Sequence, residues 1–132
     1  MIMDKKQLTE QEIRTRYITP AIVKADWMAS QIREEYAITQ GRIIARGGTF
    51  KRDKAKYADY VLFYKPHIPL AVVEAKDNNH AVSDGMQQAL EYAEMLKIPF
   101  VFTSNGDGFT FYNRMISEGD KEQFVPLDAS RG

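Results

Sequence analysis

The chain has 132 residues, enough for one domain with a single hydrophobic core. Its 18 basic residues balance 18 acidic ones, and a net charge of zero disfavours a protein that coats nucleic acid through bulk electrostatics. The absence of cysteine excludes disulfides, thiolate metal sites and thiol nucleophiles. No apolar run approaches the roughly 18 residues of a membrane span, and no signal-peptide pattern opens the chain, so we expect a cytoplasmic protein without membrane contact.

Helices are expected first along the chain. Thr9 is followed three residues later by Glu12, which is the spacing of a capping box, and the helix that it opens should run through residue 17 or beyond. Thr19-Pro20 can start another helix, because proline is comfortable at the first helical position. The segment 32–38 alternates at strand period, although its charged residues are also compatible with a helix.

Strands and one further helix should make up the rest of the domain. The clearest strands are Ala58–Tyr64 and Leu70–Lys76, joined by Lys65–Pro69, whose prolines suit a connection and not a ladder. The other expected elements are a short strand over 42–45, a helix over Ala81–Lys97, strands over Pro99–Thr103 and Phe109–Asn113, and a turn at Ser104–Gly106. This order indicates an α/β fold, with a mixed sheet, flanking helices and an α-β-β-β-α-β core.

Positive charge is concentrated between residues 42 and 56. The basic residues there are Arg42, Arg46, Lys51, Arg52, Lys54 and Lys56, against the single acid Asp53. Such a strip can follow a phosphate backbone, but it can equally be a solvated loop. Charge alone leaves both interpretations open.

Two acidic residues lie on the two clearest strands. If the hairpin closes around residues 66–69, Tyr64 lies opposite Pro69, and the same register brings Asp59 opposite Glu74. Directly opposed residues have β-carbons about 4.5–5.5 Å apart. Two carboxylates so close repel each other unless something positive lies between them, and a hard divalent cation with oxygen ligands fits that place.

Lys76 follows Glu74 by two residues, so alternation places both side chains on one face of the sheet. There the ammonium group can orient or help to deprotonate a metal-bound water, or stabilise negative charge in a transition state. A cross-strand salt bridge between Lys76 and Asp59 or Glu74 would explain the same residues without any chemistry. The short pattern by itself leaves the two interpretations even.

Ala58–Leu62 followed by Val72–Asp77 resembles the PD-(D/E)xK nuclease motif, with alanine where proline usually precedes the acid. Segments elsewhere resemble the N-terminal domain of type I restriction endonuclease R subunits in particular. These segments are Glu12–Arg16, Thr39–Ile43, Gly85–Ala93, and Pro99–Phe102 running into Ser104–Gly106. Each is short, but their order and spacing are fairly specific, and together they extend from about Thr9 to Asn113.

The resemblance implies a restriction-endonuclease-like fold and a type I site-specific deoxyribonuclease. It implies that Asp59 and Glu74 hold Mg²⁺, or Mn²⁺, and that Lys76 is catalytic. Residues 1–116 would form the nuclease domain, and 117–132 a tail or the start of a linker to motor domains that this chain lacks. The partners implied are double-stranded DNA and the methyltransferase and specificity subunits. ATP would act only through the absent motor domains, and no phosphate-binding loop is found here.

The resemblance also suggests supporting residues, each with a simpler explanation. Gln88 and Tyr92 lie one helical turn apart, on a face expected to be separate from the stripe of Met86 and Ala93. There they would line the cleft and support the site, or be a solvated glutamine and a half-buried aromatic. Glu12 would be a further catalytic acid or only a helix cap. Arg16, Arg42, Lys51 and Arg52 would contact DNA or only solvate the surface. Two other functions stay open, a catalytically silent nuclease-fold module that binds DNA or a subunit, and an unrelated α/β interaction domain.

Overall fold

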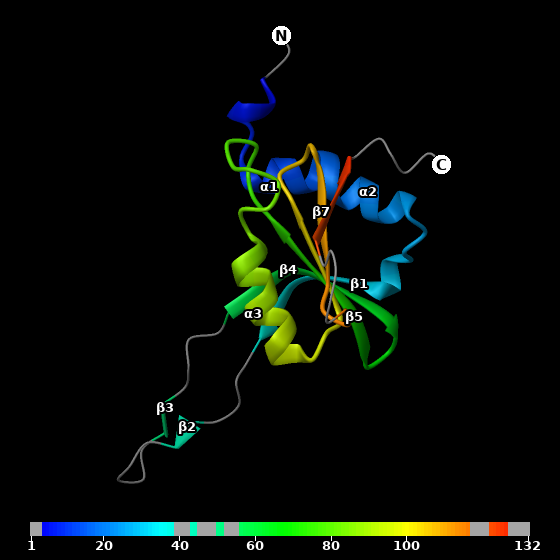
Figure 1. Cartoon of the computed structure of the whole chain (residues 1–132), viewed down its shortest axis with the longest axis vertical. Coiled ribbons are helices and arrows are strands. Elements are labelled where there is room, and N and C mark those ends of the chain that lie inside the picture. The colour runs from blue at the N-terminus through cyan, green and yellow to red at the C-terminus, as the bar shows by residue number, and fades with distance from the viewer. Residues whose placement is uncertain (1–3, 39–42, 45–49, 52–55, 117–121, 127–132) are drawn as a thin grey trace.

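The computed structural model describes residues 4–38, 43–44, 50–51, 56–116 and 122–126 of the chain (Figure 1). The helical elements are η1 (Lys5–Gln7), α1 (Glu10–Ile13), the π-helical η2 (Arg14–Ile18), α2 (Thr19–Lys24), η3 (Ala29–Gln31) and α3 (Met86–Leu96). The strands are β1 (Ile32–Ile38), β2 (Ile43–Ile44), β3 (Phe50–Lys51), β4 (Lys56–Lys65), β5 (Ile68–Ala75), β6 (Phe100–Ser104), β7 (Gly108–Asn113) and β8 (Glu122–Pro126). No helix within these ranges is long and apolar enough to span a membrane.

Six of the strands form one mixed sheet in the order β1-β4-β5-β6-β7-β8. The neighbours β5 and β6 run parallel and α3 connects them, whereas the other neighbouring pairs are antiparallel. The pair β2–β3 is drawn apart from this sheet (Figure 1). The expected α/β class, with a mixed sheet and flanking helices, is therefore confirmed.

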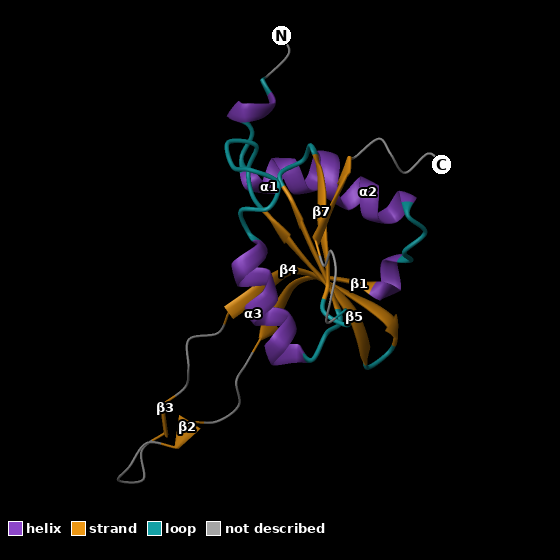
Figure 2. Cartoon of the chain, in the orientation of Figure 1, coloured by secondary structure: helices purple, strands orange, loops and turns teal. Residues whose placement is uncertain are grey.

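Helices cover both faces of the sheet (Figure 2). On one face Ile13, Ile18 and Ile22 of the N-terminal helices pack against Tyr60 of β4 and Val73 of β5. The opposite face carries α3, whose buried residues Met86, Ala89, Tyr92 and Ala93 pack against Val61 and Val72. Because alternate residues of one strand point to opposite faces, β4 and β5 contribute to both cores.

The N-terminal helices form one continuous run with a wider turn in its middle. Thr9 and Glu12 make the expected capping box, each side chain accepting from the other residue's main-chain amide. Pro20 has no amide hydrogen and would clash with the carbonyl four residues before it in a regular α-helix. The turn before it is π-helical instead, with the Thr19 amide donating to the Arg14 carbonyl. The expected second helix is present, but no loop separates it from the first.

The connection between β4 and β5 is shorter than the sequence indicated. Only Pro66 and His67 form the turn, and His67 has a φ of 73°. Pro69 lies inside β5 and pairs with Phe63, so the expected pairing of Pro69 with Tyr64 is wrong. A proline is tolerated here because the ladder is irregular at this point and β6 begins to pair only at Ala71.

The limits of α3 also differ from the expected helix over 81–97. The helix begins at Met86, because Ala81–Gly85 folds into turns in which the Asp84 carboxylate accepts from the Ala81 amide. At the other end Lys97 is left-handed, with a φ of 59°, and stops the helix. In addition, β8 pairs with β7, so the sheet continues into the segment expected to be a tail or linker.

Gly106 in the turn between β6 and β7 provides a test of the packing between this turn and α1. Its φ is +92°, and an added β-carbon would lie 3.0 Å from Cγ2 of Ile13. We predict that Gly106→Ala lowers the free energy of unfolding by about 1–3 kcal/mol. Gly85→Ala is the control, since its β-carbon would meet its nearest neighbour at 3.5 Å and its φ is −86°. Equal urea midpoints for the two variants would contradict this account.

Candidate active site

Asp59 and Glu74 lie side by side where the β4–β5 ladder ends. The last regular pair is Tyr60 with Val73, and one more step in that register sets Asp59 opposite Glu74, as the sequence predicted. Both acids stand two residues from valines in the core beneath α3, so strand alternation assigns both residues to the α3 face. The amide of Ala75 donates to Oδ2 of Asp59 at 2.7 Å, so a carboxylate occupies a position where a strand carbonyl would normally accept.

The Glu74 carboxyl group is unusual because it is buried and one of its two oxygens has no partner. The residue is 4% exposed, and Oε1 has no hydrogen-bond partner among the described residues. Burial and the neighbouring Asp59 raise the pKa of Glu74 to about 10, so without a cation this group is protonated at neutral pH. Thr103, which pairs with Glu74 on β6, has a buried hydroxyl oxygen that is likewise unpartnered within the described structure. Buried polar atoms without partners normally signal a missing ligand or water.

Lys76 lies on the same side of the sheet as Glu74. Gly85, just before α3, touches both side chains, because a β-carbon added there would lie 3.5 Å from Cβ of Glu74 and 3.7 Å from Cε of Lys76. The Lys76 amide donates to the carbonyl of Ser104 at 2.9 Å, which holds the residue against β6. No ion pair of Lys76 is formed with described residues, so the salt-bridge alternative has no support here.

The first helix carries two acids, Glu10 and Glu12, whose surroundings differ. Glu12 is occupied by its own cap, and its other oxygen lies 3.8 Å from Arg16. Glu10 is the residue whose pKa is raised, by desolvation first and then by the charge of Asp59, although its side chain keeps contact with solvent. Capping therefore accounts for Glu12, and a catalytic role for Glu12 stays a prediction. The sequence did not single out Glu10, because the capping pattern at Thr9 and Glu12 shows where this short helix begins but not which of its faces packs on the sheet.

A second residue that the sequence reasoning passed over is Arg14, four residues after Glu10 on the same helical run. Its side chain is buried on the face opposite to α3, and its guanidinium donates to the main-chain carbonyl of Asp59 at 3.3 Å. Arg14 shares a helical face with Tyr17 and Ile18, three and four residues later, and this spacing could have signalled a buried arginine that needs partners, because an unpaired buried charge is costly.

Gln88 and Tyr92, one helical turn apart, form a hydrogen bond in which Nε2 of Gln88 donates to the Tyr92 hydroxyl at 2.7 Å. Tyr92 is buried and packs with the Met86 and Ala93 stripe, so the expectation of a separate helical face was wrong for this residue. The pKa of Tyr92 is raised by burial and then by the charge of Glu74, so its hydroxyl lies near the paired acids. Gln88 itself is exposed.

The basic strip is described only in part. Arg42 and Arg52 lie outside the described residues, and of Lys51 only the backbone is described, where it pairs with Ile43. Arg16 is exposed on the helix, beside Glu12. Its proposed contact with DNA and that of the basic strip stay predictions.

Residues 9–129 match the family model for the N terminus of the type I restriction enzyme R protein. The chain belongs to this family. A curated relative, the type I restriction enzyme EcoAI endonuclease subunit of Escherichia coli, is 46% identical over 128 residues, which are 96% of this chain and 16% of the relative. The chain thus spans about a sixth of that subunit's length.

A solved structure shares the fold of this R protein N-terminal chain. It is a fragment assigned to the HsdR subunit of a type I restriction enzyme from Vibrio vulnificus YJ016, with a TM-score of 0.74 and 37% sequence identity. The match covers 89% of this chain and 23% of that one. The restriction-endonuclease-like fold expected from the sequence is thereby supported at the level of both sequence and structure.

The residues of this R protein N-terminal domain suit a magnesium ion. Mg²⁺ usually keeps several waters and takes one or two protein carboxylates, which Asp59 and Glu74 can supply. Among the described residues no three acidic or histidine side chains are grouped closely enough to form a complete protein cage. The donor set therefore fits a partly hydrated ion on two acids.

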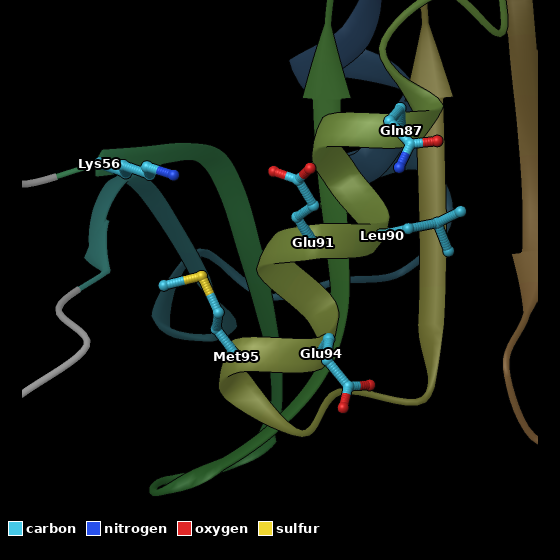
Figure 3. A pocket seen from close by; sticks show the side chains of 6 residues that line it. All are labelled: Lys56, Gln87, Leu90, Glu91, Glu94 and Met95. Atoms are coloured by element: carbon cyan, nitrogen blue, oxygen red, sulfur yellow. The ribbon is translucent and has the colours of Figure 1, made fainter.

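A separate hollow of about 420 Å³ lies on the outer side of α3 (Figure 3). It is lined by Lys56, Gln87, Leu90, Glu91, Glu94 and Met95. None of the predicted catalytic or metal-holding residues lines it, and its two glutamates would repel a phosphate. This hollow does not belong to the candidate active site of the R protein domain.

The raised pKa of Glu74 gives the folding of the metal-free domain a defined pH dependence. Because the folded pKa of about 10 lies above the ordinary 4.5, the folded state binds more protons between these values, and stability falls as pH rises through this window. We predict that the melting temperature in EDTA falls from about pH 6 to about pH 9 in the wild type and falls much less in Glu74→Gln. Parallel curves for the two proteins would show that Glu74 is not held neutral by the fold.

Proposed function

We propose that this chain is the Mg²⁺-dependent DNA endonuclease domain of a type I restriction enzyme R subunit. In this proposal it hydrolyses phosphodiester bonds of double-stranded DNA within a complex that contains methyltransferase and specificity subunits. ATP is used by motor domains outside these 132 residues. Membership of the R protein N-terminal family and the name of the Escherichia coli relative, an endonuclease subunit, support this proposal.

One observation carries the proposal at the level of the site. Asp59 and Glu74 place two carboxyl groups together, one of them buried with an unpartnered oxygen, and Lys76 lies on the same side. A buried carboxyl oxygen that lacks a hydrogen-bond partner lowers the stability of a protein. Residues of this kind are retained where a ligand completes them.

The acids of the site would hold the cation and orient what binds to it. Asp59 keeps Oδ2 on the Ala75 amide, which fixes the direction of its second oxygen. Glu74 loses its proton when a cation replaces that proton, since opposite charge favours the carboxylate. Asp59 and Glu74 would hold the divalent cation, which when bound would supply charge stabilisation at the attacked phosphate and a water of lowered pKa.

Lys76 has a separate part in the proposed reaction. The stem of its side chain lies against Gly85, as the side chain of Glu74 does, and its ammonium forms no ion pair with described residues. It can therefore donate a hydrogen bond to a phosphate oxygen as negative charge develops, or position the attacking water. The Gln88–Tyr92 pair would support Glu74 from the side of α3.

The role of Lys76 separates a nuclease from a silent module of the same fold. We predict that Lys76→Ala leaves Mn²⁺ binding intact or tighter, because a competing cation is removed, and lowers plasmid cleavage by the complete restriction complex at least about 100-fold. Asp59→Asn and Glu74→Gln should lose both metal binding and cleavage. Lys24→Ala, an exposed lysine of α2, is the matched control and should behave as wild type.

Cleavage at the wild-type rate by Lys76→Ala would remove the catalytic assignment. A wild-type complex that binds DNA but never cuts it, with or without Mg²⁺, would favour the silent module that binds DNA or a subunit. Thermal melting of each variant separates a failure of folding from a failure of chemistry.

The proposed DNA contact of the basic strip makes a second prediction. Reversing the charge of Lys51 and Arg52 should weaken DNA binding, because fewer counterions are released when the protein binds. The slope of log affinity against log salt should fall by about 1 for each phosphate that the variant no longer neutralises. Reversal of Lys24 and Lys97, which are exposed elsewhere, is the control for total charge. If the two double variants have the same salt slope, the strip is only a solvated segment.

A further inference from the structure

Arg14 forms a buried clamp behind the candidate active site. Its side chain is 4% exposed, and its guanidinium binds Oε1 of Glu34 at 3.0 Å, the carboxylate of Glu35, and the carbonyl of Asp59 at 3.3 Å. The guanidinium also lies over the ring of Tyr60, with 4.9 Å between Cζ and the centroid. One side chain thus ties the N-terminal helices to both β1 and β4.

The strand β1 is distorted in a way that serves this clamp. Glu34 pairs with Tyr60, whose side chain lies on the face of Arg14, so Glu34 points to that face as well. In a regular strand Glu35 would point to the opposite face. Its φ of 50° breaks the alternation, and both carboxylates reach Arg14. A left-handed glutamate costs about 1 kcal/mol or more, and the structure maintains it only where other contacts over-determine it.

Arg14 contacts the main chain of Asp59 more closely than its carboxylate, which leaves the carboxylate free to bind a cation. Arg14 approaches the main-chain carbonyl of Asp59 to 3.3 Å, while Oδ1 of Asp59 is 3.8 Å from Nη1, beyond hydrogen-bonding distance. The two β1 glutamates take the closer ionic contacts with the guanidinium. Arg14 therefore fixes where Asp59 stands without neutralising it in a tight ion pair.

We propose that Arg14 is a positioning residue of the active site, which, together with Glu34 and Glu35, presents the Asp59 carboxylate to the divalent cation. This inference rests on the proposed function, because it assumes that Asp59 binds the cation. Glu10 lies one helical turn before Arg14 on the same helical run. The β1 glutamates act as a counter-anchor that keeps the guanidinium away from the Asp59 carboxylate.

Positioning and simple electrostatics predict opposite signs when Arg14 is removed. If Arg14 only adds positive charge near the site, its removal should strengthen the binding of a cation. If it only stabilises the fold, cation affinity should stay the same while the melting temperature falls. If it positions Asp59, affinity should fall even though a repelling charge is gone. Substitutions of residues that orient metal ligands typically weaken binding by about 10–100-fold.

The test is calorimetric titration of Mn²⁺ into the full 132-residue chain. We expect Arg14→Met, which keeps the apolar stem, to bind Mn²⁺ at least about tenfold more weakly than wild type. Arg14→Lys restores the charge but not the fork that reaches two strands, and it should recover only part of the affinity. Ile22→Ala, a buried change in the same helical layer, is the control for stability and should melt earlier with unchanged affinity.

The double variant Glu34→Gln with Glu35→Gln removes the two acidic partners of Arg14. Both side chains are largely exposed, so this variant should fold, and its Mn²⁺ affinity can be measured even if Arg14→Met does not fold. Without its anchors the guanidinium should turn to Asp59 and compete with Mn²⁺, weakening binding several-fold. Wild-type or tighter affinity in Arg14→Met, or in the double variant, would overturn the inference alone. If the wild-type chain itself binds no Mn²⁺, the proposed function falls together with the inference.

Discussion

Two carboxyl groups held together at the end of a buried strand pair are the constraint on which the rest of this domain depends. Asp59 and Glu74 lie next to a core that would otherwise exclude charge, and Glu74 stays neutral there unless a cation binds. The surrounding elements make the placement possible. The sheet fixes the register, Gly85 leaves room beside Glu74 at the start of α3, and Arg14 holds the main chain of Asp59 from behind. Together these contacts hold the two carboxyl groups side by side, although burying them lowers the stability of the fold.

Much of this geometry could be predicted from the sequence because it follows from local rules. Alternation of side chains along β4 and β5 predicted that Asp59 and Glu74 share one face of the sheet. The capping box at Thr9 predicted where the first helix begins. The register at the acids came out correctly although the turn did not. The irregular pairing around Phe63 and Pro69 lies between the turn and the site, and the pairs from Leu62 onward return to the expected register.

The features that could not be predicted from the sequence depend on contacts between elements that are distant in the chain. Nothing local marks Glu35 as left-handed, because its conformation serves a guanidinium that belongs to the first helix. Both Glu10 and Glu12 lie in the first turn of the same helix, and the sequence does not show which of them lies near Asp59. Only the packing of the helix on the sheet decides this. Tyr92 was expected on a separate helical face, but α3 turns it into the core beside Glu74. Tertiary packing decided all three.

The hydrogen bond between the Ala75 amide and the Asp59 carboxylate ties the proposed chemistry of this domain to the closure of its sheet. In many enzymes an active-site acid is a burden on folding, and exchanging it for an apolar residue relieves the protein. Here such an exchange leaves a main-chain donor without its acceptor at the end of β5, at a cost of about 1–3 kcal/mol. Asparagine alone among uncharged residues of this size keeps an acceptor in the same place. If the proposed cleavage were lost by substitution at this position, asparagine would therefore disturb the sheet least.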